Sequence, residues 1–550
     1  MRDDSFFRVY MNKFYITTPV YYVNDVPHIG HTYTTVAADI LARYHRMVGD
    51  KTFFLTGTDE HGANIENKAK QIGKKPQQFA DEISAQFQLA WHELNISHNN
   101  FLRTTNPGHL KAVQKALEYM HKKGDIYLGK YQGLYCRGCE QFKSETDLVD
   151  GLCPDHLIKP EKVSEDCYTF RLSKYQSELL KKIRSDELKI LPDERKNEII
   201  SFYEKPGLAD VSFSRKNVKW GIPLPWDKSQ TVYVWADAFL NYLTGLGWSP
   251  YATSYAKASE VKKVSGDKDG NWNSLPSEAP LGGAKEWWPP DLQLMSKDIL
   301  RVHATIWPAM LLSLELPLPK QLFIHGYFLI NGQKMSKSLG NVITPGQLIK
   351  KYGVDGTRYL LMSTTSFGSD SDISWRWFDE KYNADLANGL GNLVARATTL
   401  ALSLAKTKIK LHKTAPTIEV WAGQEFNHSV GKVWQNYKQA LWQLKIDQAL
   451  SIASQQQKFL DSYITTTRPW QLIKDNKPIA GTVIYNVLER LRQISWLIWP
   501  FMPQTTEKIW QALGLDFKSE IKKDLKTASR WLGLKPSCKV KKIPSLFPRI

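Results

Sequence analysis

Residues 13–62 read KFYITTPVYYVNDVPHIGHTYTTVAADILARYHRMVGDKTFFLTGTDEHG, and this stretch decides the fold of the 550-residue chain. Lys13–Thr18 is rich in aromatic and β-branched residues and predicts a strand ended by Pro19. Apolar residues recur at helical spacing over Ile29–Met47, and Thr52–Leu55 predicts a second strand. Strand, helix and strand at this spacing form a βαβ unit. Such a unit indicates a parallel sheet with ligands at the carboxyl ends of its strands.

The composition excludes several classes of protein. Hydrophobic residues make up 42% of the chain and aromatic residues 12%, which excludes a mainly disordered or fibrous protein. No run of eighteen apolar residues occurs, so no membrane span is predicted. The N-terminus lacks an apolar segment followed by a small-residue cleavage site, so secretion is not expected. Five cysteines do not make a disulfide framework, and a cytoplasmic setting is expected.

The net charge of +18 is concentrated in the last third of the chain. Residues 1–380 carry 47 Lys and Arg against 44 Asp and Glu, whereas residues 381–550 carry 26 against 11. A polyanion such as nucleic acid is the expected partner of the basic part, because Lys and Arg that neutralise phosphates release condensed counterions. The alternative is a solvated basic surface that only aids solubility.

The rest of the chain indicates an insertion and a helical domain. From Gly124 to Pro225, short strands and charged loops interrupt the α/β pattern. Strand-like runs return at Thr231–Trp235 and Leu322–Leu329, and Lys257–Pro290 reads as a surface excursion rich in Gly, Ser, Lys and Pro. After Asp385 the pattern is helical, so the basic part is an α-helical domain.

Two imidazoles flank a glycine at the predicted start of the first helix, in the run Pro27-His28-Ile29-Gly30-His31. A helix N-terminus offers partial positive charge and free N–H groups, and Gly30 permits close approach to the backbone. These residues therefore predict a phosphate-binding site. The alternative is that the two histidines are only capping or surface residues.

A second candidate is the run Gly332-Gln333-Lys334-Met335-Ser336-Lys337-Ser338-Leu339-Gly340-Asn341. Small and hydroxylated residues between two lysines make a loop that can bring ammonium groups to a polyphosphate. In isolation such a stretch is more often an ordinary solvated turn. Walker-type and dinucleotide-type glycine loops are missing from both places, so phosphate binding needs other means.

Together, His-Ile-Gly-His and Lys-Met-Ser-Lys-Ser resemble the two signature motifs of class I aminoacyl-tRNA synthetases. Through most of its length the chain resembles the methionyl-tRNA synthetase family. The stretches that carry the resemblance are Tyr15–His31, Phe54–Gly62, Tyr131–His156, Val211–Pro225, Tyr233–Tyr242, Ile299–Met310, Phe323–Asn341 and the ending Leu546–Ile550.

The resemblance implies a Rossmann-like parallel-sheet (α/β) catalytic domain with a zinc-containing insertion, followed by an α-helical bundle. It also implies a monomeric methionine–tRNA ligase that uses ATP and Mg²⁺. The predicted segments are the first half of the catalytic fold (1–123), the inserted domain (124–225), the second half of the catalytic fold (226–330), the signature loop with a stem-contact region (331–385) and the anticodon-binding domain (386–550).

The resemblance also implies residue roles. His28 and His31 would contact the ATP phosphates beside Gly30, and Lys334 and Lys337 would stabilise the pyrophosphate as charge develops. The methionine pocket would be formed by Tyr22, Asp59, Trp235, Ala238, Tyr242 and His303. Aromatic walls suit a polarizable thioether, and a carboxylate suits the substrate ammonium. Without the resemblance, Trp235 and Tyr242 would be read as core residues.

Cysteine spacing predicts a zinc site. Cys136-x2-Cys139 and Cys153-x2-His156 supply four ligands in two close pairs, which suits tetrahedral Zn²⁺ with no open position, and therefore a structural metal. The alternative is unpaired cysteines. The site falls in the insertion, where the family carries one zinc knuckle, and Cys167 and Cys538 are read as packing residues.

Asn392, Arg396 and Trp470 match positions through which the family reads the anticodon. An indole can stack on an unstacked base, and residues four apart on one helix face can contact the same target. By itself, Trp470 would be read as a core or cap residue, since Pro469 precedes it at a predicted helix start.

The sequence leaves two other functions open. One is a class I synthetase for another apolar amino acid, although an insertion of this size is too short for a large editing domain. The other is a non-catalytic RNA-binding relative, which would be expected to have lost signature residues that this chain retains. One departure from the family pattern concerns Leu292–Ile299 (LQLMSKDI), which keeps Lys297 and Asp298 but lacks the family's His and the Gly before Lys297.

Overall fold

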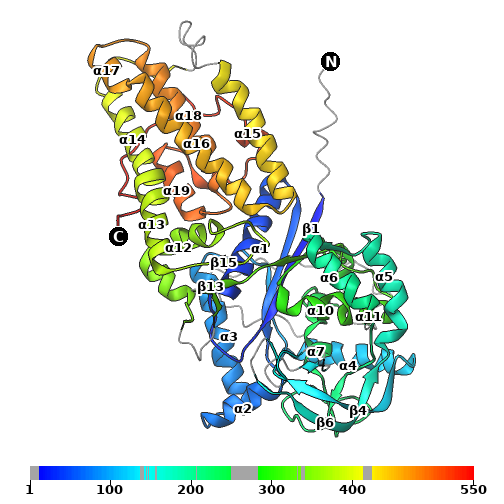
Figure 1. Cartoon of the computed structure of the whole chain (residues 1–550). Helices are drawn as coiled ribbons and strands as arrows, with labels where there is room; N and C mark the ends of the chain where they lie inside the picture. The colour runs from blue at the N-terminus through cyan, green and yellow to red at the C-terminus, as the bar shows by residue number, and fades with distance from the viewer. Residues whose placement is uncertain are drawn as a thin grey trace, which may run out of the picture.

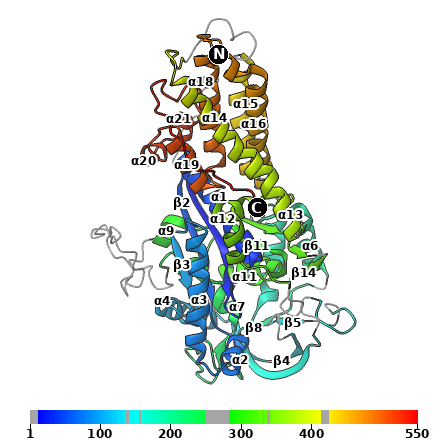
Figure 2. The same cartoon turned by 90° about the vertical axis from the view of Figure 1, so that its left-hand side faces the viewer.

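The computed structural model describes residues 12–136, 141–143, 145, 148–154, 158–205, 207–248, 283–330, 332–335, 341–412 and 424–550. An α/β domain lies at the centre of the molecule, with a tall helical domain on one side and a smaller β-rich lobe at the opposite end (Figure 1). The view turned by 90° shows the helices stacked directly above the α/β domain (Figure 2).

The predicted parallel sheet is confirmed. Six strands pair in the order β3-β2-β1-β11-β12-β7, and every pairing is parallel. Their bounds are Asn100–Arg103 (β3), Lys51–Asp59 (β2), Lys13–Tyr22 (β1), Leu292–Ser296 (β11), Gln321–His325 (β12) and Lys189–Leu191 (β7). The chain builds outward from β1 on one side and from β11 on the other. The boundary between β1 and β11 is therefore the topological switch point at which such sheets bind ligands.

Side chains of the central strands alternate between two hydrophobic cores. Phe14 and Ile16 of β1 enter one core and Tyr15 enters the other, and Phe323 and Leu322 of β12 divide in the same way. This is the period of two that a pleated strand imposes. The core that holds Phe14 also includes α1 (Ile29–Val48) and α3 (Pro76–Glu93), and it continues into the helical domain. The catalytic sheet and the helical domain therefore share one core.

Two predicted strands differ from the structure. β1 does not end at Pro19 but continues to Tyr22, with its register against β2 shifting between Thr17 and Val20. Proline lacks an N–H, so the ladder slips there rather than stops. The strand expected over Thr231–Trp235 is limited to β10 (Thr231–Val232), and helix α7 (Val234–Ala238) follows. Trp235 is therefore presented by a short helix.

Part of the segment expected as an insertion forms a lobe of its own, whereas α5 (Gln176–Arg184) and α6 (Asp193–Glu204) lie beside α10 (Leu300–Ala304) and α11 (Ile306–Ser313) (Figure 1). β4, β5, β6 and β8 make an antiparallel sheet in the order β5-β4-β6-β8. Their bounds are Ile126–Cys136 (β4), Gln141–Lys143 (β5), Glu161–Phe170 (β6) and Val211–Ser212 (β8). β7 also lies inside the expected range 124–225, yet it pairs with β12 of the central sheet. Assigning all of 124–225 to the insertion is therefore wrong for β7.

The helical domain is built around one almost fully buried helix, α18. Its other main helices are α14 (Asn392–Leu404), α15 (Gln424–Trp442), α16 (Ile446–Thr467) and α19 (Pro503–Ala512). α18 (Ala480–Ile498) buries polar residues as well as apolar ones, as a helix enclosed on all sides must. Its Arg492 forms a buried ion pair with Glu489 at 2.7 Å. Within the described ranges, no helix has both the length and the apolar character that a membrane crossing needs.

A buried arginine joins the two domains. Arg358, on α12 (Pro345–Met362), is fully buried and its Nη2 lies 2.7 Å from Oδ2 of Asp39 on α1. The same guanidinium donates hydrogen bonds to the carbonyl groups of Pro500 and Phe501, each at 2.8 Å, between α18 and α19. It also donates to Leu94 O at 3.1 Å. One side chain thus connects α1 and the end of α3 with α12 and the helical domain.

Candidate active site

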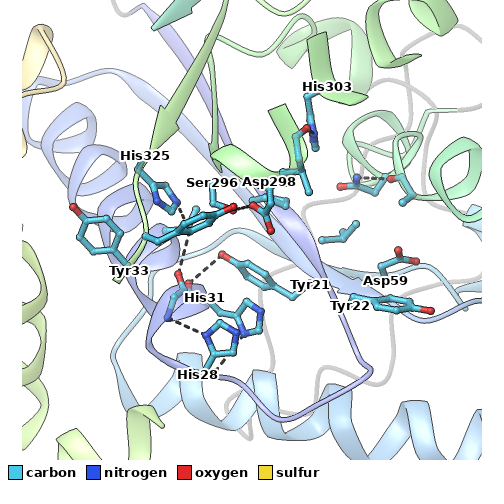
Figure 3. Close-up of a pocket in the computed structure, with 18 of the residues that line it drawn as sticks. Tyr21, Tyr22, His28, His31, Tyr33, Asp59, Ser296, Asp298, His303 and His325 are labelled. Carbon is cyan, nitrogen blue, oxygen red and sulfur yellow. Dashed lines mark hydrogen bonds between the residues drawn. The ribbon is translucent and has the colours of Figure 1, made fainter. Parts of the chain in front are cut away.

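One pocket opens at the switch point, with a cavity volume of about 350 Å³. It is lined by the carboxyl ends of β1, β2, β11 and β12, the start of α1, and α7. Nine predicted site residues line it together: Tyr22, His28, Gly30, His31, Asp59, Trp235, Ala238, Tyr242 and His303. Figure 3 shows His28 and His31 on one side of the pocket, Tyr22 and Asp59 on another, and Asp298 between these groups. Residues predicted for phosphate and for methionine therefore face the same cavity.

The two signature histidines cap the helix that they precede. His28 is the N-cap of α1, and its Nδ1 accepts a hydrogen bond from Gly30 N at 3.0 Å. In return His31 Nδ1 accepts from His28 N at 3.3 Å, and the two rings stack with centroids 3.8 Å apart. Ile29 N donates to Ile343 O at 3.0 Å. The N–H groups of His28, Ile29 and Gly30 all have acceptors, so the expectation of free N–H groups is wrong for them. The two histidine rings both cap the helix and line the pocket.

His31 is a neutral hydrogen-bond donor. Burial, together with the neighbouring His28 imidazole, holds the pKa of His31 well below its usual range. Because Nδ1 accepts a hydrogen bond, the proton of the neutral ring lies on Nε2. The ring can thus offer an N–H to an anionic ligand without carrying a positive charge itself.

The opposite end of the pocket is a wall of aromatic rings. The Tyr242 hydroxyl on α8 (Asn241–Thr244) donates to His303 Nε2 at 2.8 Å, and His303 Nδ1 donates to Ile299 O at 2.9 Å. Tyr15 donates to the carbonyl of Tyr242 at 2.7 Å. Phe239 meets the His303 ring edge-on at 4.9 Å. Tyr242 is almost fully buried and also lines the cavity, so it is both a core residue and a pocket residue.

His303 should make stability fall in mild acid. Burial lowers the pKa of His303 from its usual 6.5 to about 4. Between these values the unfolded chain takes up a proton that the folded chain refuses, so stability falls as pH drops from 6.5 to 4. The loss from this residue is about 3 kcal/mol. We expect the free energy of unfolding of His303→Gln to fall by about 3 kcal/mol less than that of the wild type between pH 6.5 and pH 4. The exposed control His92→Gln should show the same fall as the wild type, and an equal fall in all three proteins would contradict the prediction.

Asp59 ends β2 at the rim of the pocket, and the next residue anchors it. Glu60 is fully buried. Its carboxylate accepts hydrogen bonds from Arg103 Nε at 2.7 Å, from Arg103 Nη2 at 2.8 Å and from the Thr105 hydroxyl at 2.6 Å. Asp59 O accepts a hydrogen bond from Val23 N at 3.0 Å. The backbone that carries the Asp59 carboxylate is therefore fixed between β1 and β3.

The departure at Leu292–Ile299 leaves the sheet regular. β11 keeps parallel pairings with both β1 and β12. Gln293 is fully buried, its Oε1 accepts from Trp307 Nε1 at 3.1 Å, and its Nε2 lies 3.4 Å from Thr17 Oγ1. Ser296 donates to Asp298, and both line the pocket. An altered strand sequence is thus accommodated by local hydrogen bonds.

The sequence reasoning missed several residues of the pocket. His325 ends β12, and its Nε2 accepts from the Thr34 hydroxyl at 2.6 Å while Nδ1 donates to Gly326 O at 2.8 Å. Burial lowers the pKa of His325. At Gly326 any Cβ would lie 2.3 Å from the carbonyl carbon of Ser369, so only glycine fits there. His325 and Gly326 could have been found from their place in the strand expected over Leu322–Leu329, since ligands bind at the carboxyl ends of parallel strands. That expected strand divides into β12 and β13 (Phe328–Ile330).

The second signature motif reaches the pocket through its methionine. Lys334 belongs to β14 (Gln333–Lys334), which pairs with β13, and Met335 lines the cavity. Lys337 lies outside the described residues, and so does the side chain of Lys334. The excursion expected over Lys257–Pro290 also lies mostly outside them.

The described half of the predicted zinc set consists of two buried cysteines. Cys136 ends β4, pairs with Gln141 of β5 and is fully buried. Cys153 is also fully buried, and its N–H donates to Ile158 O at 2.9 Å. Cys139 and His156 lie outside the described residues.

The predicted anticodon residues lie on two neighbouring helices of the helical domain. Asn392 and Arg396 share α14, with Asn392 exposed and Arg396 paired with Asp461 of α16. Trp470 is the second residue of α17 (Pro469–Lys474) and is 47% exposed, so it is not a core residue. α17 sits beside α14 at the far end of the bundle (Figure 1).

Comparisons with known proteins agree with this arrangement. The chain matches the family described as "tRNA synthetases class I (M)" over residues 14–167 and 156–398, and the "Anticodon-binding domain of tRNA ligase" over residues 423–544. It is 40% identical over 540 residues to the methionine–tRNA ligase of Clostridium acetobutylicum, covering 98% of this chain and 78% of that protein. It is 41% identical over 520 residues to the enzyme of Thermosynechococcus vestitus, covering 93% and 92%.

A solved structure shows the same fold. Mycobacterium tuberculosis methionyl-tRNA synthetase in complex with methionyl-adenylate superposes with a TM-score of 0.85 at 31% identity, covering 98% of this chain and all of that one. The parallel sheet, the signature histidines and Met335 in one pocket, and the helical domain therefore agree with the sequence relatives, which match along nearly the whole chain. The chain belongs to the methionyl-tRNA synthetases, the class I ligases that join methionine to tRNA.

Proposed function

We propose that the switch-point pocket is where this ligase activates methionine with ATP, using the residues assigned above. The observation that carries the proposal is the single cavity shared by the signature histidines and the aromatic wall. Tyr22, Trp235, Ala238, Tyr242 and His303 form the methionine end. Rings there give the thioether dispersion and sulfur–aromatic contacts, and the Asp59 carboxylate holds the ammonium group.

The phosphate end works by hydrogen bonding and charge. His28 and His31 donate to the phosphates of MgATP, and the α1 terminus adds the positive end of its dipole. Since His31 is neutral, the cationic charge that the departing pyrophosphate needs comes from Lys334 and Lys337. The methionine carboxylate attacks the α-phosphate and the bond to pyrophosphate breaks, which gives methionyl-adenylate. A hydroxyl of the 3′-terminal ribose of tRNA then attacks the methionyl carbonyl, the bond between the acyl group and the phosphate breaks, and AMP leaves.

ATP–pyrophosphate exchange with each amino acid in turn tests this proposal. We expect exchange with methionine and not with leucine, isoleucine or valine. In the same assay, Lys337→Ala should slow adenylate formation far more than it weakens methionine binding. Exchange with none of the amino acids, or equal losses in rate and binding for the variant, would contradict the assignment.

Gly30→Ala should damage activity without damaging the fold. A Cβ at Gly30 would lie 2.9 Å from His28 Cε1 and 3.0 Å from His28 Nδ1, so the ring must move off its cap. We expect adenylate formation to slow about tenfold, because small displacements of positioning groups are costly. Gly346→Ala is a matched control, since Gly346 is also the second residue of a helix and its Cβ would meet open space. Equal activity of the two variants would contradict the prediction.

The helical domain would hold the anticodon side of the tRNA. Its excess of positive charge supports phosphate contacts, and the exposed Trp470 supports stacking on an anticodon base. Asn392 and Arg396 would reach base edges from α14. Arg396 would exchange its contact with Asp461 for one with the RNA, or share it.

We also propose a structural zinc ion held by Cys136, Cys139, Cys153 and His156. Two fully buried thiols suit Zn²⁺, which binds deprotonated sulfur and in a structural site takes a closed set of four ligands. Metal analysis of the purified protein should give one zinc per chain. Cys136→Ser and Cys153→Ser should lose it, whereas Cys538→Ser should retain it, and zinc retained in the first two variants would contradict the site.

We infer, finally, a monomer that acts in the cytoplasm. The first statement rests on the family resemblance and the second on a cysteine content too low for a disulfide framework. Light scattering of the purified protein tests the first, and localisation of the tagged chain in its host tests the second.

A further inference from the structure

A carboxylate and two imidazoles form a buried network directly behind the pocket. Asp237 is 1% exposed, and its Oδ2 lies 2.7 Å from His61 Nδ1. Its Oδ1 lies 2.7 Å from His109 Nε2. His109 Nδ1 in turn lies 2.7 Å from the Thr244 hydroxyl. None of these four residues belongs to the set of side chains that line the cavity.

The network links the elements that carry the proposed methionine residues. Asp237 stands on α7 between Trp235 and Ala238. His61 follows Asp59 by two residues, at the end of β2. Thr244 ends α8, which carries Tyr242, while His109 comes from the first turn of α4 (Pro107–Lys122). A single carboxylate therefore connects both sides of the pocket to a longer helix behind them.

These elements need such an anchor. α7 has five residues and α8 has four, which is too short for either helix to hold its own geometry. Glu60 already fixes one side of the β2 end against Arg103, and His61 fixes the other side against α7. Burial opposes the charge of Asp237, yet His61 and His109 hold its pKa below the usual range. The carboxylate is thus an ionised acceptor, for which two imidazole N–H groups are strong partners.

We propose that Asp237, acting through His61 and His109, is a positioning residue that sets the spacing between Asp59 and the wall formed by Trp235 and Ala238. The proposal rests on the methionine pocket assigned above and adds to it. Asp237 touches no substrate. It controls the KM for methionine because the thioether-binding wall stands on the same helix as Asp237, and the hydrogen bond to His61 ties that helix to the strand end that carries the ammonium-binding carboxylate. The hydrogen bond to His109 holds the helix against α4.

The test is ATP–pyrophosphate exchange with separate titrations of methionine and ATP, alongside thermal unfolding. His61→Ala and Asp237→Ala remove the link, and each should raise the methionine KM about tenfold with little change in the ATP KM. His61→Asn is the rescue variant, because its amide nitrogen can occupy the place of Nδ1. It should stay within about twofold of the wild-type methionine KM.

Asp125→Ala is the matched control. Asp125 is likewise 1% exposed and accepts hydrogen bonds from Tyr175 at 2.6 Å and Ser313 at 2.7 Å, away from the pocket. This variant should lower the unfolding midpoint and leave the methionine KM unchanged. If Asp237→Ala does not fold, the methionine KM of His61→Ala compared with that of His61→Asn tests the positioning role.

Three results would overturn the proposal: an unchanged methionine KM in His61→Ala, parallel rises in both KM values, or no rescue by asparagine. Asp59→Asn separates this failure from failure of the pocket assignment. If Asp59→Asn raises the methionine KM and His61→Ala does not, the pocket stands and the positioning role falls. If Asp59→Asn has no effect on the methionine KM, the pocket assignment itself is wrong.

Discussion

Replacing Arg358 by alanine is expected to lower the free energy of unfolding by about 3–5 kcal/mol, the range found when one partner of a buried ion pair is removed. The variant would leave the buried Asp39 carboxylate with one of its two ion-pair partners in the described part of the chain, Arg43. It would also leave three backbone carbonyls, of Leu94, Pro500 and Phe501, without their guanidinium donor. Burial opposes the charge of Asp39, yet Arg43 and Arg358 hold its pKa below the usual range.

Chemical denaturation followed by tryptophan fluorescence measures the effect. Arg376→Ala is the control, because Arg376 also pairs with an acid, Glu380 at 2.7 Å, but its side chain is 88% exposed. An exposed pair of this kind contributes at most about 1 kcal/mol. A loss of less than that for Arg358→Ala would show that the junction does not stabilise the molecule. Because Arg358 joins two domains, we further expect the variant's denaturation curve to separate into two transitions.

Replacing His31 by alanine is expected to slow adenylate formation by about 10²–10³-fold, the usual cost of removing one donor to developing charge. The lost group is the Nε2–H of a neutral, half-buried ring that lines the pocket. Glutamine places an amide nitrogen near the position of Nε2, so His31→Gln should retain much of the rate. Single-turnover measurement of methionyl-adenylate formation separates this effect from that of substrate binding.

His45→Ala is the matched control for His31. His45 lies on the same helix, stacks on Phe14 at 3.4 Å and pairs with Asp50 at 2.7 Å, and it does not line the pocket. Its loss should affect stability and leave the rate per folded molecule unchanged. A rate for His31→Ala within tenfold of the wild type, or one equal to that of His31→Gln, would contradict the donor role.

Local patterns predicted the parallel sheet, because the βαβ unit of residues 13–62 carries periods of 2 and 3.6 that the structure keeps. The predicted secondary structure was wrong where the surroundings of a short segment determine its conformation. Thr231–Trp235 is as β-branched and aromatic as a strand, yet the pocket wall requires a helical turn from Val234. β7 is three residues long and pairs at the sheet edge, which leaves almost no signal in the sequence.

The site was predictable in part for a different reason. Its signature residues are contiguous motifs, so His28, His31 and Asp59 could be singled out along the chain. Contacts between distant residues could not: 319 residues separate Asp39 from Arg358, and 176 separate His61 from Asp237. Nor does the sequence reveal that the signature histidines cap their own helix, since that depends on the rotamers of two stacked rings.

The shared core and the Arg358 junction give the molecule a fixed length. The pocket lies at one end of this span and α14 and α17 lie at the other, and the hydrophobic core runs unbroken between the sheet and the bundle. We therefore expect the protein to favour a tRNA whose anticodon and 3′ end are separated by the matching distance. A hinge introduced at the junction should weaken that preference.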